Sequence, residues 1–324
     1  MKAIVQDRYG SADVLELREI EQPEIGDHEV LVRVHAGGVD RGVWHLMTGV
    51  PYLMRVIGFG FRAPKDPIRG TDFAGRVEAV GRNVASVQVG DEVFGESNGS
   101  YAEYARVHED KLARKPANLS FEQAAAIPTS AVTALQGLRD HAKVKPGQRV
   151  LVIGASGGVG TFAVQLAKVF GAEVTGVCSS NKLDVVRSAG ADHVVDYTQD
   201  DFTESSTRYD VILDIAGNRP LRHLRRVLAP TATLVIVGGE DAGLWLGGLE
   251  RQLGAMLLSP LVRQSFRVFV ATMHKSELQH LAELVEAGKL SPIIDRTFPL
   301  SEAANAIRYM EDGHARGKVV VAVQ

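Results

Sequence analysis

A loop rich in glycine carries the clearest chemical signal in the sequence. From Ile153 to Gly160 the chain reads IGASGGVG, with an apolar run before it and a helical pattern after it. Counted back from Gly160, the loop fits A-x-G-x-x-G, a variant of the dinucleotide fingerprint in which pyrophosphate approaches bare backbone at a helix N-terminus. Three glycines in four positions cost conformational entropy unless that bare backbone is used. We predict dinucleotide contacts from Ser156, Gly157, Gly158 and Val159.

The strand after this loop ends in hydroxyl groups and a cation. About twenty residues after the glycines, a fold that uses NADH places Asp or Glu to bind the ribose 2′-hydroxyl. Here the tip reads VCSSNK, from Val177 to Lys182. A carboxylate would repel a 2′-phosphate, whereas hydroxyls and an ammonium group hydrogen-bond to it and neutralise it. The sequence therefore favours NADPH, bound by Ser179, Ser180 and Lys182, although the serines also suit capping of the next helix.

The same loop fits a second motif, the nucleophile elbow G-x-S-x-G of serine hydrolases, over residues 154–158. In that alternative Ser156 attacks an ester. The triad would be completed by Asp214 with His274 or His280. The elbow does not require Gly160 and does not explain the polar strand tip, so we favour the dinucleotide interpretation.

Composition excludes several classes of protein. The chain has 324 residues and a formal net charge of −3, with no long run of one sign. Nucleic-acid and membrane-surface proteins need a concentrated basic face, so we expect neither partner. The chain start lacks an apolar core of signal-peptide length and the apolar stretches are too short to span a membrane, so we expect a cytoplasmic protein. The single cysteine, Cys178, excludes zinc sites with two or more cysteine ligands.

The elements that must position these residues change in kind along the chain. The first ~110 residues read as short strands between turn residues and predict a β-rich barrel or sandwich. Within them, Trp44 to Arg62 is apolar without a clean period. It is interpreted either as a loop and helical turn packed into the core or as a mobile wall of a binding cleft. Farther along, Ser120 is a candidate N-cap, and Pro128 is expected to divide an alanine-rich helical stretch in two.

Strands and helices then alternate, which predicts a parallel sheet covered on both faces. The expected strands are 149–153, 173–177, 193–195, 211–215 and 233–237, and the expected helices are 161–170, 182–189 and 221–228. An apolar helical stretch, a strand RVFVATM and an amphipathic helix follow. The closing strand KVVVAV resembles the opening section. We therefore predict a discontinuous first domain, 1–122 completed by 273–324, around a second domain, 123–272.

Eight stretches together resemble the medium-chain dehydrogenase/reductase superfamily over nearly the full chain. They are AGGVDRGVWHLMTG, GTDFAGRVEAVG, VGDEVFG, GSYAEYARV, AAAIPTSAVTAL, GASGGVG, GADHVVDY and GHARGKVVV. The subgroup that the chain resembles most is the zinc-free quinone oxidoreductase-like branch. The resemblance implies an α/β protein with a GroES-like catalytic domain, a Rossmann domain, and a cleft for NADPH and substrate.

The chain departs from the zinc-dependent members of that superfamily. They carry a cysteine after a Gly-Val pair, where this chain has Asp40, and a Gly-His-Glu motif, where it has Gly70-Thr71-Asp72. Their loop of four cysteines is absent. Zinc-assisted alcohol oxidation needs a Lewis acid held by such ligands, so we predict no metal. A site built from Asp40, His45 and Asp72 is conceivable, and zinc-type alcohol dehydrogenase activity stays an alternative.

The zinc-free relatives reduce conjugated carbonyls and quinones, so the resemblance implies an NADPH-dependent reductase of quinones, enones or small carbonyl compounds. It implies contacts with the adenosine phosphate from Lys182 and Tyr197. Residues that line the cofactor cleft would be Thr129, Gly217 and Gly238. On the substrate side we select Asp40, Trp44 and Tyr52. Asp40 replaces an amide of many relatives, which leaves open a non-catalytic NADPH-binding protein, and Tyr52 is either a proton donor or a core residue.

The resemblance also implies a homodimer. RVFVATM, residues 267–273, matches the segment with which relatives pair edge strands across a two-fold axis. An exposed edge of β-branched residues favours such pairing. The apolar segment from Trp245 to Leu261 is expected near the dimer interface or the mouth of the cleft.

Overall fold

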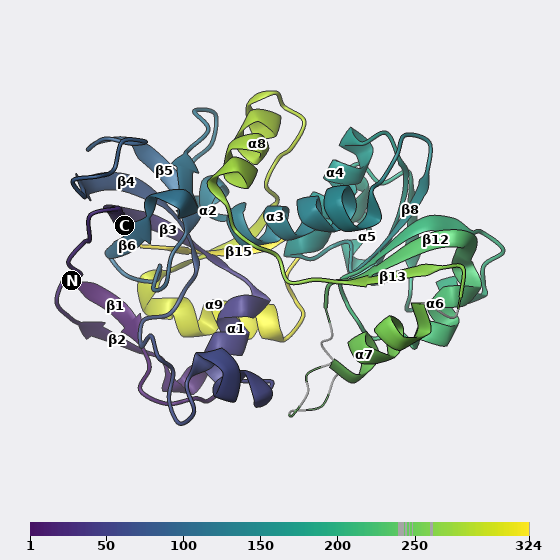
Figure 1. Cartoon of the computed structure of the whole chain (residues 1–324), viewed down its shortest axis with the longest axis horizontal. Helices are drawn as coiled ribbons and strands as arrows, with labels where there is room; N and C mark the ends of the chain where they lie inside the picture. The colour runs from purple at the N-terminus through teal and green to yellow at the C-terminus, as the bar shows by residue number, and fades with distance from the viewer. Residues whose placement is uncertain (239–242, 244, 246, 248, 260–261, 324) are drawn as a thin grey trace. The chain divides into compact units, whose positions relative to one another are not determined.

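Two sheets organise the chain, one largely antiparallel and one parallel throughout (Figure 1). The structure is a computed structural model that describes residues 1–238, 243, 245, 247, 249–259 and 262–323. Backbone contacts divide the chain into two compact units. One comprises Met1–Val132 with Thr272–Gln324, and the other comprises Thr133–Ala271. They are called the catalytic unit and the nucleotide unit below, after the roles that the resemblance implies.

The sheet of the catalytic unit is built around one long strand, β3 (Glu29–Val39), whose buried face is mostly valine. The strand order is β14-β15-β3-β4-β5-β7, and β6 also pairs with β3. The C-terminal strand β15 (Lys318–Ala322) runs antiparallel to β3 and parallel to β14 (Ile294–Pro299). The other bounds are β1 Lys2–Val5, β2 Glu16–Glu19, β4 Asp72–Val80, β5 Glu92–Glu96, β6 Tyr104–His108 and β7 Leu112–Arg114.

Short helices connect these strands. α1 (Arg41–Thr48) follows β3 directly and packs with α9 (Ala303–Glu311) in one apolar cluster. α2 (Phe121–Ala125) begins at Ser120 with a capping box to Gln123, and α3 (Pro128–Gln136) begins at the proline. The predicted N-cap and the division at Pro128 are therefore confirmed. The amphipathic helix α8 is Lys275–Glu286, and a turn of π-helix covers Arg55–Phe59.

The sheet of the nucleotide unit has the order β10-β9-β8-β11-β12-β13, and its paired strands are all parallel. The order reverses at β8, which is the doubly wound arrangement of Rossmann folds. The bounds are β8 Arg149–Ile153, β9 Glu173–Cys178, β10 His193–Asp196, β11 Tyr209–Asp214, β12 Leu228–Ile236 and β13 Ser265–Val268. The predicted parallel sheet is confirmed.

Helices cover both faces of this sheet, because its strands are apolar on both sides. Figure 1 shows α4 and α5 on one face and α6 and α7 on the other. The bounds are α4 Gly158–Val169, α5 Leu183–Ser188, α6 Leu221–Val227 and α7 Leu249–Leu258. The predicted strand 267–273 proves shorter and earlier, at β13. Much of the predicted helical stretch before α7 lies outside the described residues.

Candidate functional site

The glycine loop joins β8 to α4 with its backbone bare. Gly154 has φ +85°, a conformation that favours glycine, and the loop turns there. A Cβ on Gly160 would lie 2.1 Å from the carbonyl oxygen of Gly154, so the helix approaches the strand more closely than any side chain would allow. A Cβ on Gly157 would meet nothing nearer than 3.6 Å. The Gly157 N-cap of α4 has no side-chain cap, so this helix end fits the pyrophosphate of a dinucleotide.

The C-terminal ends of β11 and β12 lie beside that loop. A Cβ on Gly154 would lie 3.3 Å from the backbone nitrogen of Ala216, just after β11. Gly217 has φ +68°, and its N–H donates to the buried carboxylate of Asp214 at 3.0 Å. A Cβ on Gly238 would lie 1.9 Å from the carbonyl oxygen of Ile215. The predicted residues Gly217 and Gly238 are thus at the sheet edge where such folds bind ligands.

Asp214 bears on the hydrolase alternative. Its carboxylate is fully buried and pairs with the guanidinium of Arg251. Burial raises the pKa of Asp214, and Arg251 opposes that rise. Among the described residues, the partners of the Asp214 carboxylate are the Arg251 guanidinium and the Gly217 N–H, and neither is the histidine that a triad requires. His280 is instead 3.8 Å from Glu283, within its own helix.

The polar tip of β9 is bonded within itself and to the next strand. Ser179 Oγ donates to Asn181 Oδ1 at 2.8 Å, and Ser180 Oγ donates to the carboxylate of Asp196. Tyr197 is 46% exposed beside them. Ser179 occupies the N-cap position of η5 (Ser180–Lys182), as the capping expectation has it, but neither serine makes a side-chain cap hydrogen bond for η5 or α5. These hydroxyls bond side chains of the turn instead.

Asp196 is a residue that the sequence reasoning missed. Hydrogen bonds from Ser180 and from Thr198 lower its pKa, so it is a carboxylate at neutral pH. The register of β9 and β10 pairs it with Cys178, at the base of the polar tip. The strand tip therefore has an acidic neighbour that the stretch from Val177 to Lys182 does not reveal. Asp196 could have been found from the sequence, because it ends the next strand of the predicted parallel sheet, and the ends of adjacent parallel strands meet at one sheet edge.

In the catalytic unit a buried carboxylate joins three distant segments. Asp72 is fully buried at the start of β4. Its Oδ1 accepts from the backbone N–H of Thr129 at 3.1 Å and from the Thr129 hydroxyl at 2.5 Å. Its Oδ2 is 3.5 Å from Nζ of Lys318, which is 1% exposed at the start of β15. Thr129, predicted to line the cofactor cleft, is thus bonded to Asp72.

Burial dominates the chemistry of that carboxylate. It raises the pKa of Asp72 to about 7; the nearby charge of Asp40 adds to the rise, and Lys318 and the Thr129 hydrogen bonds oppose it. A fully buried charge is costly unless it is paired and hydrogen-bonded. Asp72 therefore has a neutral form within reach at physiological pH. Lys318 was missed because a lone lysine at the start of an apolar strand reads as a surface residue.

Asp40 is bonded as a helix cap. It precedes α1, and its Oδ1 accepts from the backbone N–H of Val43 at 3.1 Å. Its Oδ2 accepts from the hydroxyl of Thr71 at 3.4 Å. Near the same strand end, the hydroxyl of the buried Tyr101 donates to the carbonyl oxygen of Gly38 at 2.9 Å. Asp40 is 9% exposed. Its two oxygens thus position α1 against the 70–72 segment.

Trp44 and Tyr52 have different surroundings. Trp44, in α1, donates its indole N–H to Glu311 Oε1 of α9 at 2.9 Å and packs edge-on against His45. The guanidinium of Arg55 lies over the Tyr52 ring, 4.5 Å from its centroid. α1 and the π-turn occupy much of Trp44 to Arg62, so the expected helical turn is present. The segment is not packed into the core throughout, because Val56 is 68% and Phe61 is 73% exposed.

Comparison with known proteins identifies the family. One family model, "Alcohol dehydrogenase GroES-like domain", matches residues 26–117, and another, "Zinc-binding dehydrogenase", matches residues 189–321. A 2-methylene-furan-3-one reductase of Solanum lycopersicum is 34% identical over 337 residues, which cover 99% of this chain and 79% of that protein. The chain belongs to the medium-chain dehydrogenase/reductase superfamily.

Further relatives of this medium-chain dehydrogenase/reductase agree on the branch. A chloroplastic NADPH-dependent alkenal/one oxidoreductase of Arabidopsis thaliana is 35% identical over 339 residues, covering 99% of this chain and 79% of that protein. The solved structure of a quinone oxidoreductase from Coxiella burnetii superposes with a TM-score of 0.85 at 31% identity, covering 100% of this chain and 99% of that one. The predicted GroES-like and Rossmann folds and the quinone oxidoreductase-like branch are therefore confirmed.

The zinc ion that one matched family model names does not fit the donors of this dehydrogenase/reductase. The oxygens of Asp40 accept from Val43 and Thr71, and those of Asp72 face Thr129 and Lys318. His45 bonds through Nδ1 to the carbonyl oxygen of Val50 at 2.7 Å. An ammonium group beside Asp72 is the wrong neighbour for a cation. Within the described residues, no three His, Cys, Asp or Glu side chains gather as metal ligands.

Over the described residues, no helix is both long and apolar enough to cross a bilayer.

Proposed function

We propose that this protein is a metal-independent, NADPH-dependent reductase of quinones, conjugated enones or related small carbonyl compounds. The proposal depends on two features of the structure, one for the cofactor and one for the metal. The backbone cradle at Gly157 suits a dinucleotide, while the positions of the zinc ligands hold a carboxylate bonded to Thr129 and Lys318. The names of the relatives, an alkenal/one oxidoreductase and a quinone oxidoreductase, support the same class of acceptor.

Bound NADPH would supply a hydride to an electrophilic carbon of the acceptor. The cofactor-binding role that we assign to this chain falls on Ser156, Gly157, Gly158 and Val159 for the pyrophosphate. It falls on Ser179, Ser180, Lys182 and Tyr197 for the adenosine phosphate. Thr129, Gly217 and Gly238 would line the cofactor. Donors fixed by a folded backbone already point at the anion and need no reorganisation when it binds, which favours tight binding.

The substrate side is assigned to Asp40, Trp44 and Tyr52. We assign proton donation to the hydroxyl of Tyr52, whose ring is held under the guanidinium of Arg55. Trp44 is assigned a wall of the substrate site, because its N–H is already bonded to Glu311. Asp40 is assigned a positioning role, because it caps the helix that carries Trp44.

The cofactor assignment is tested by titrating the protein with NADPH and NADH. We expect NADPH to bind at least tenfold more tightly. Lys182→Gln should raise the Kd for NADPH about tenfold, because a charge-assisted hydrogen bond contributes roughly 1.5–3 kcal/mol, and should leave NADH nearly unchanged. Lys145→Gln is the matched control, since Lys145 is exposed in the same unit.

Three results would contradict the proposal. A preference for NADH would remove the role of the polar tip, and Asp196, bonded to Ser180, would then be the residue to examine. Tight NADPH binding without oxidation by any quinone or enone would favour a non-catalytic binding protein. Metal analysis of the same sample completes the test, because stoichiometric zinc contradicts the metal-free assignment.

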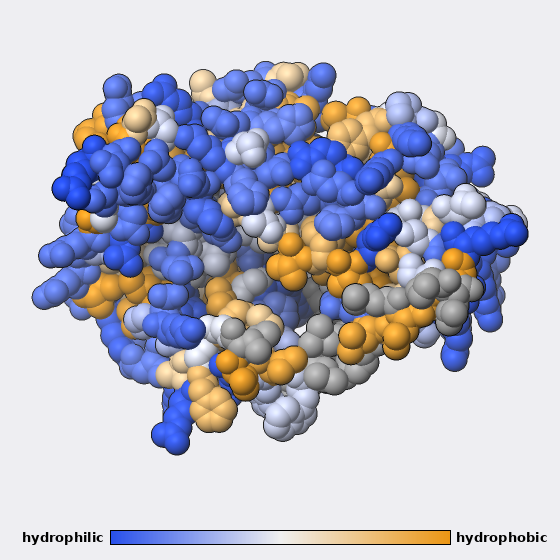
Figure 2. Space-filling view, in the orientation of Figure 1, coloured by the Kyte–Doolittle hydropathy of each residue, from blue (hydrophilic) through white to orange (hydrophobic). Residues whose placement is uncertain are grey.

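We also propose a homodimer formed through the edge of the parallel sheet. β13 is an end strand in the sheet order, and Val270 just after it is 91% exposed. Figure 2 shows apolar side chains at the surface over α7, where Leu253 is 55% and Leu257 is 74% exposed. Trp245 is 74% exposed; the other residues of the 245–261 segment are described only in part. Sedimentation should give twice the chain mass, and Val270→Lys should reduce it.

The functional domains are proposed as 1–122 with 273–324, and 123–272. The compact units of the structure divide at neighbouring positions, after Val132 and before Thr272. We propose the cytoplasm as the location. It is supported by the single, buried Cys178, whose thiol pKa burial raises to about 11, so that it is poorly reactive as a thiolate.

A further inference from the structure

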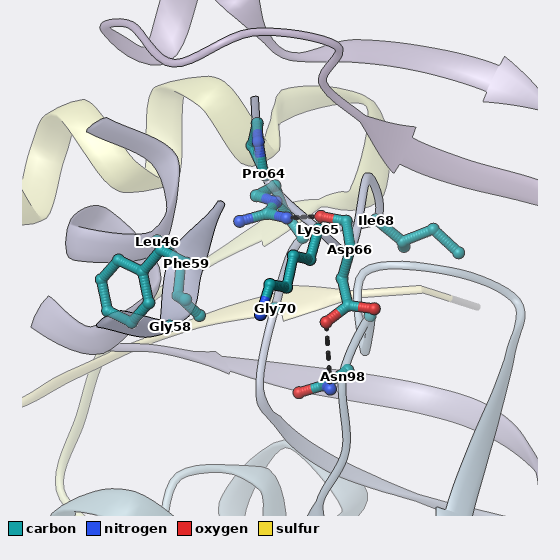
Figure 3. Close-up of a pocket in the computed structure, with 11 residues that line it drawn as sticks. Leu46, Gly58, Phe59, Pro64, Lys65, Asp66, Ile68, Gly70 and Asn98 are labelled. Atoms are coloured by element: carbon teal, nitrogen blue, oxygen red, sulfur yellow. Dashed lines mark hydrogen bonds between the residues drawn. The ribbon is translucent and has the colours of Figure 1, made fainter. Parts of the chain in front are cut away.

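A cavity in the catalytic unit is lined by groups of mixed polarity (Figure 3). Its volume is about 220 Å³. α1 contributes Leu46, the π-turn contributes Phe59, and the rest of the lining comes from the 64–70 loop and the turn at Asn98. Figure 3 draws these side chains together with the hydrogen bond that the Asn98 amide donates to Asp66. Apolar and cationic walls therefore share one space.

Arg69 is the buried cation of this cavity. The residue is only 3% exposed, and its backbone is held by bonds to Ile4 and Tyr101. Of its guanidinium nitrogens, Nη2 donates to the carbonyl oxygen of Asp66. Nε is buried without a hydrogen-bond partner, and across the described ranges no carboxylate lies within ion-pair distance of Arg69. A buried guanidinium with an unused donor and no paired anion is costly.

The charge around the cavity is positive. Lys65 and Arg69 are two cations, and Asp66 is the one carboxylate of the lining, which leaves a net charge of +1. Asp66 is itself turned to the amide of Asn98, at 3.2 Å. Burial lowers the pKa of Arg69 to about 10, so it stays charged at neutral pH. A guanidinium with free donors binds planar oxyanions well.

We propose that this cavity is a binding site for a small oxyanion, a carboxylate or a phosphate group, with Arg69 as its main ligand and Lys65 at its rim. The apolar side chains of Leu46, Phe59 and Ile68 would contact a short hydrocarbon attached to that anion. The elements that line the site also carry or contact substrate residues, because Leu46 belongs to α1, which carries Trp44, and Gly70 precedes Thr71, which bonds to Asp40. An acceptor that carries a carboxylate would place it here; that role rests on the reductase function proposed above, whereas binding of the oxyanion does not.

The first experiment measures binding of inorganic phosphate to the full chain. Saturating NADPH is present throughout so that the glycine loop is occupied, and chloride keeps the ionic strength constant. Titration calorimetry should give saturable binding in the parent protein. Lys65→Gln should weaken it at least threefold and Arg69→Lys about tenfold. Arg62→Gln, an exposed arginine of the same loop outside the lining, should leave it unchanged.

The folded state of each variant is checked by circular dichroism and its melting temperature. If Arg69→Lys does not fold, Lys65→Gln against Arg62→Gln decides, because both side chains are exposed. Equal phosphate affinity in the parent, Lys65→Gln and Arg62→Gln overturns the proposal. So does an absence of saturable binding in the parent.

The second experiment identifies the source of the oxyanion. The parent is assayed with 4-oxopent-2-enoate and with its methyl ester, which differ by one negative charge. We expect kcat/KM to favour the carboxylate about tenfold, and the ratio to fall toward one in Lys65→Gln but not in Arg62→Gln. Phosphate binding with no such preference supports a site for a free oxyanion. If neither acceptor is reduced and no other quinone or enone is reduced either, the proposed reductase function fails, and the phosphate titration still decides the cavity.

Discussion

The glycine loop of the nucleotide unit is made of backbone groups, whereas the Asp72 network of the catalytic unit is made of side chains. The tightest approach in the loop, of Gly160 to Gly154, joins residues six positions apart. The network joins Asp72 to Lys318, 246 positions away. A site made of backbone can be recognised in a short stretch of sequence. A site made of distant side chains can be recognised only once the fold has brought them together.

The largest effect should come from placing a side chain in the loop. Gly160→Ala puts a Cβ 2.1 Å from the Gly154 carbonyl oxygen, so α4 must move away from β8. We expect a loss of about 3 kcal/mol in the free energy of unfolding, typical of severe overpacking, together with loss of NADPH binding.

Gly157→Ala is the matched control for that variant. Its Cβ would meet nothing nearer than 3.6 Å, so the fold should be retained within about 1 kcal/mol. Urea denaturation of the two variants measures the cost of packing a Cβ into the loop. NADPH titration measures whether that Cβ keeps the dinucleotide away from the backbone. Equal destabilisation by both would contradict the backbone account of the loop.

The buried pair of the catalytic unit should give the next largest effect. Lys318→Met removes the cation and leaves the buried Asp72 carboxylate unpaired, which typically costs about 3 kcal/mol. Adding Asp72→Asn removes the charge that was left. We expect the double variant to be less destabilised than the sum of the two single variants, by about 1 kcal/mol or more in a double-mutant cycle. Additive effects would mean that the two groups do not interact.

The pH dependence of stability sharpens the account of Asp72. Its pKa is raised from 3.8 to about 7 by burial, so the native state keeps a proton that the unfolded state releases. The free energy of unfolding should therefore be highest below pH 4 for this group and fall as pH rises toward 7. We expect Asp72→Asn to remove a decline of about 1–3 kcal/mol between pH 4 and 7. An unchanged pH profile in Asp72→Asn would show that the pKa of Asp72 is the same in the folded and the unfolded state.

The smallest effect concerns the cap at Asp40. Asp40→Ala removes the oxygen that accepts from Val43 and should cost about 1 kcal/mol. Asp40→Asn keeps an oxygen at that place and should cost only a few tenths. Thermal melting of both variants makes the comparison. If Asp40→Asn abolishes activity while melting like the parent, Asp40 has a chemical role beyond positioning α1.

Much of the fold was predictable from local pattern. The strand Arg149–Ile153 was predicted at its observed bounds, and the Ser120 cap and the division at Pro128 follow from side-chain chemistry within a few residues. The predicted bounds were less accurate where a neighbouring strand decides where a strand begins and ends. The strand 267–273 is observed at Ser265–Val268, since an edge strand ends where its neighbour β12 stops offering partners.

The candidate site divides in the same way. The loop at Gly157 was identified from residue types alone, and its geometry fits the ligand that those types suggest. The carboxylate of Asp196 beside Ser180 was missed, because it enters from the next strand. Arg69 was missed as well, since nothing in its local sequence indicates that a guanidinium is buried against a cavity.

The sequence by itself determined the alternation of strands and helices, the bare loop between β8 and α4, and the family. The alternation and the loop depend on the conformational preferences of neighbouring residues, which act over a few positions, and the family is recognised from eight short stretches along the chain. Only the tertiary structure decided that Lys318 faces Asp72, that Asp196 faces Ser180 and that Arg69 lines a cavity. The physical reason is that burial and Coulomb interactions depend on distance in space, and strand pairing brings together residues that the chain keeps far apart.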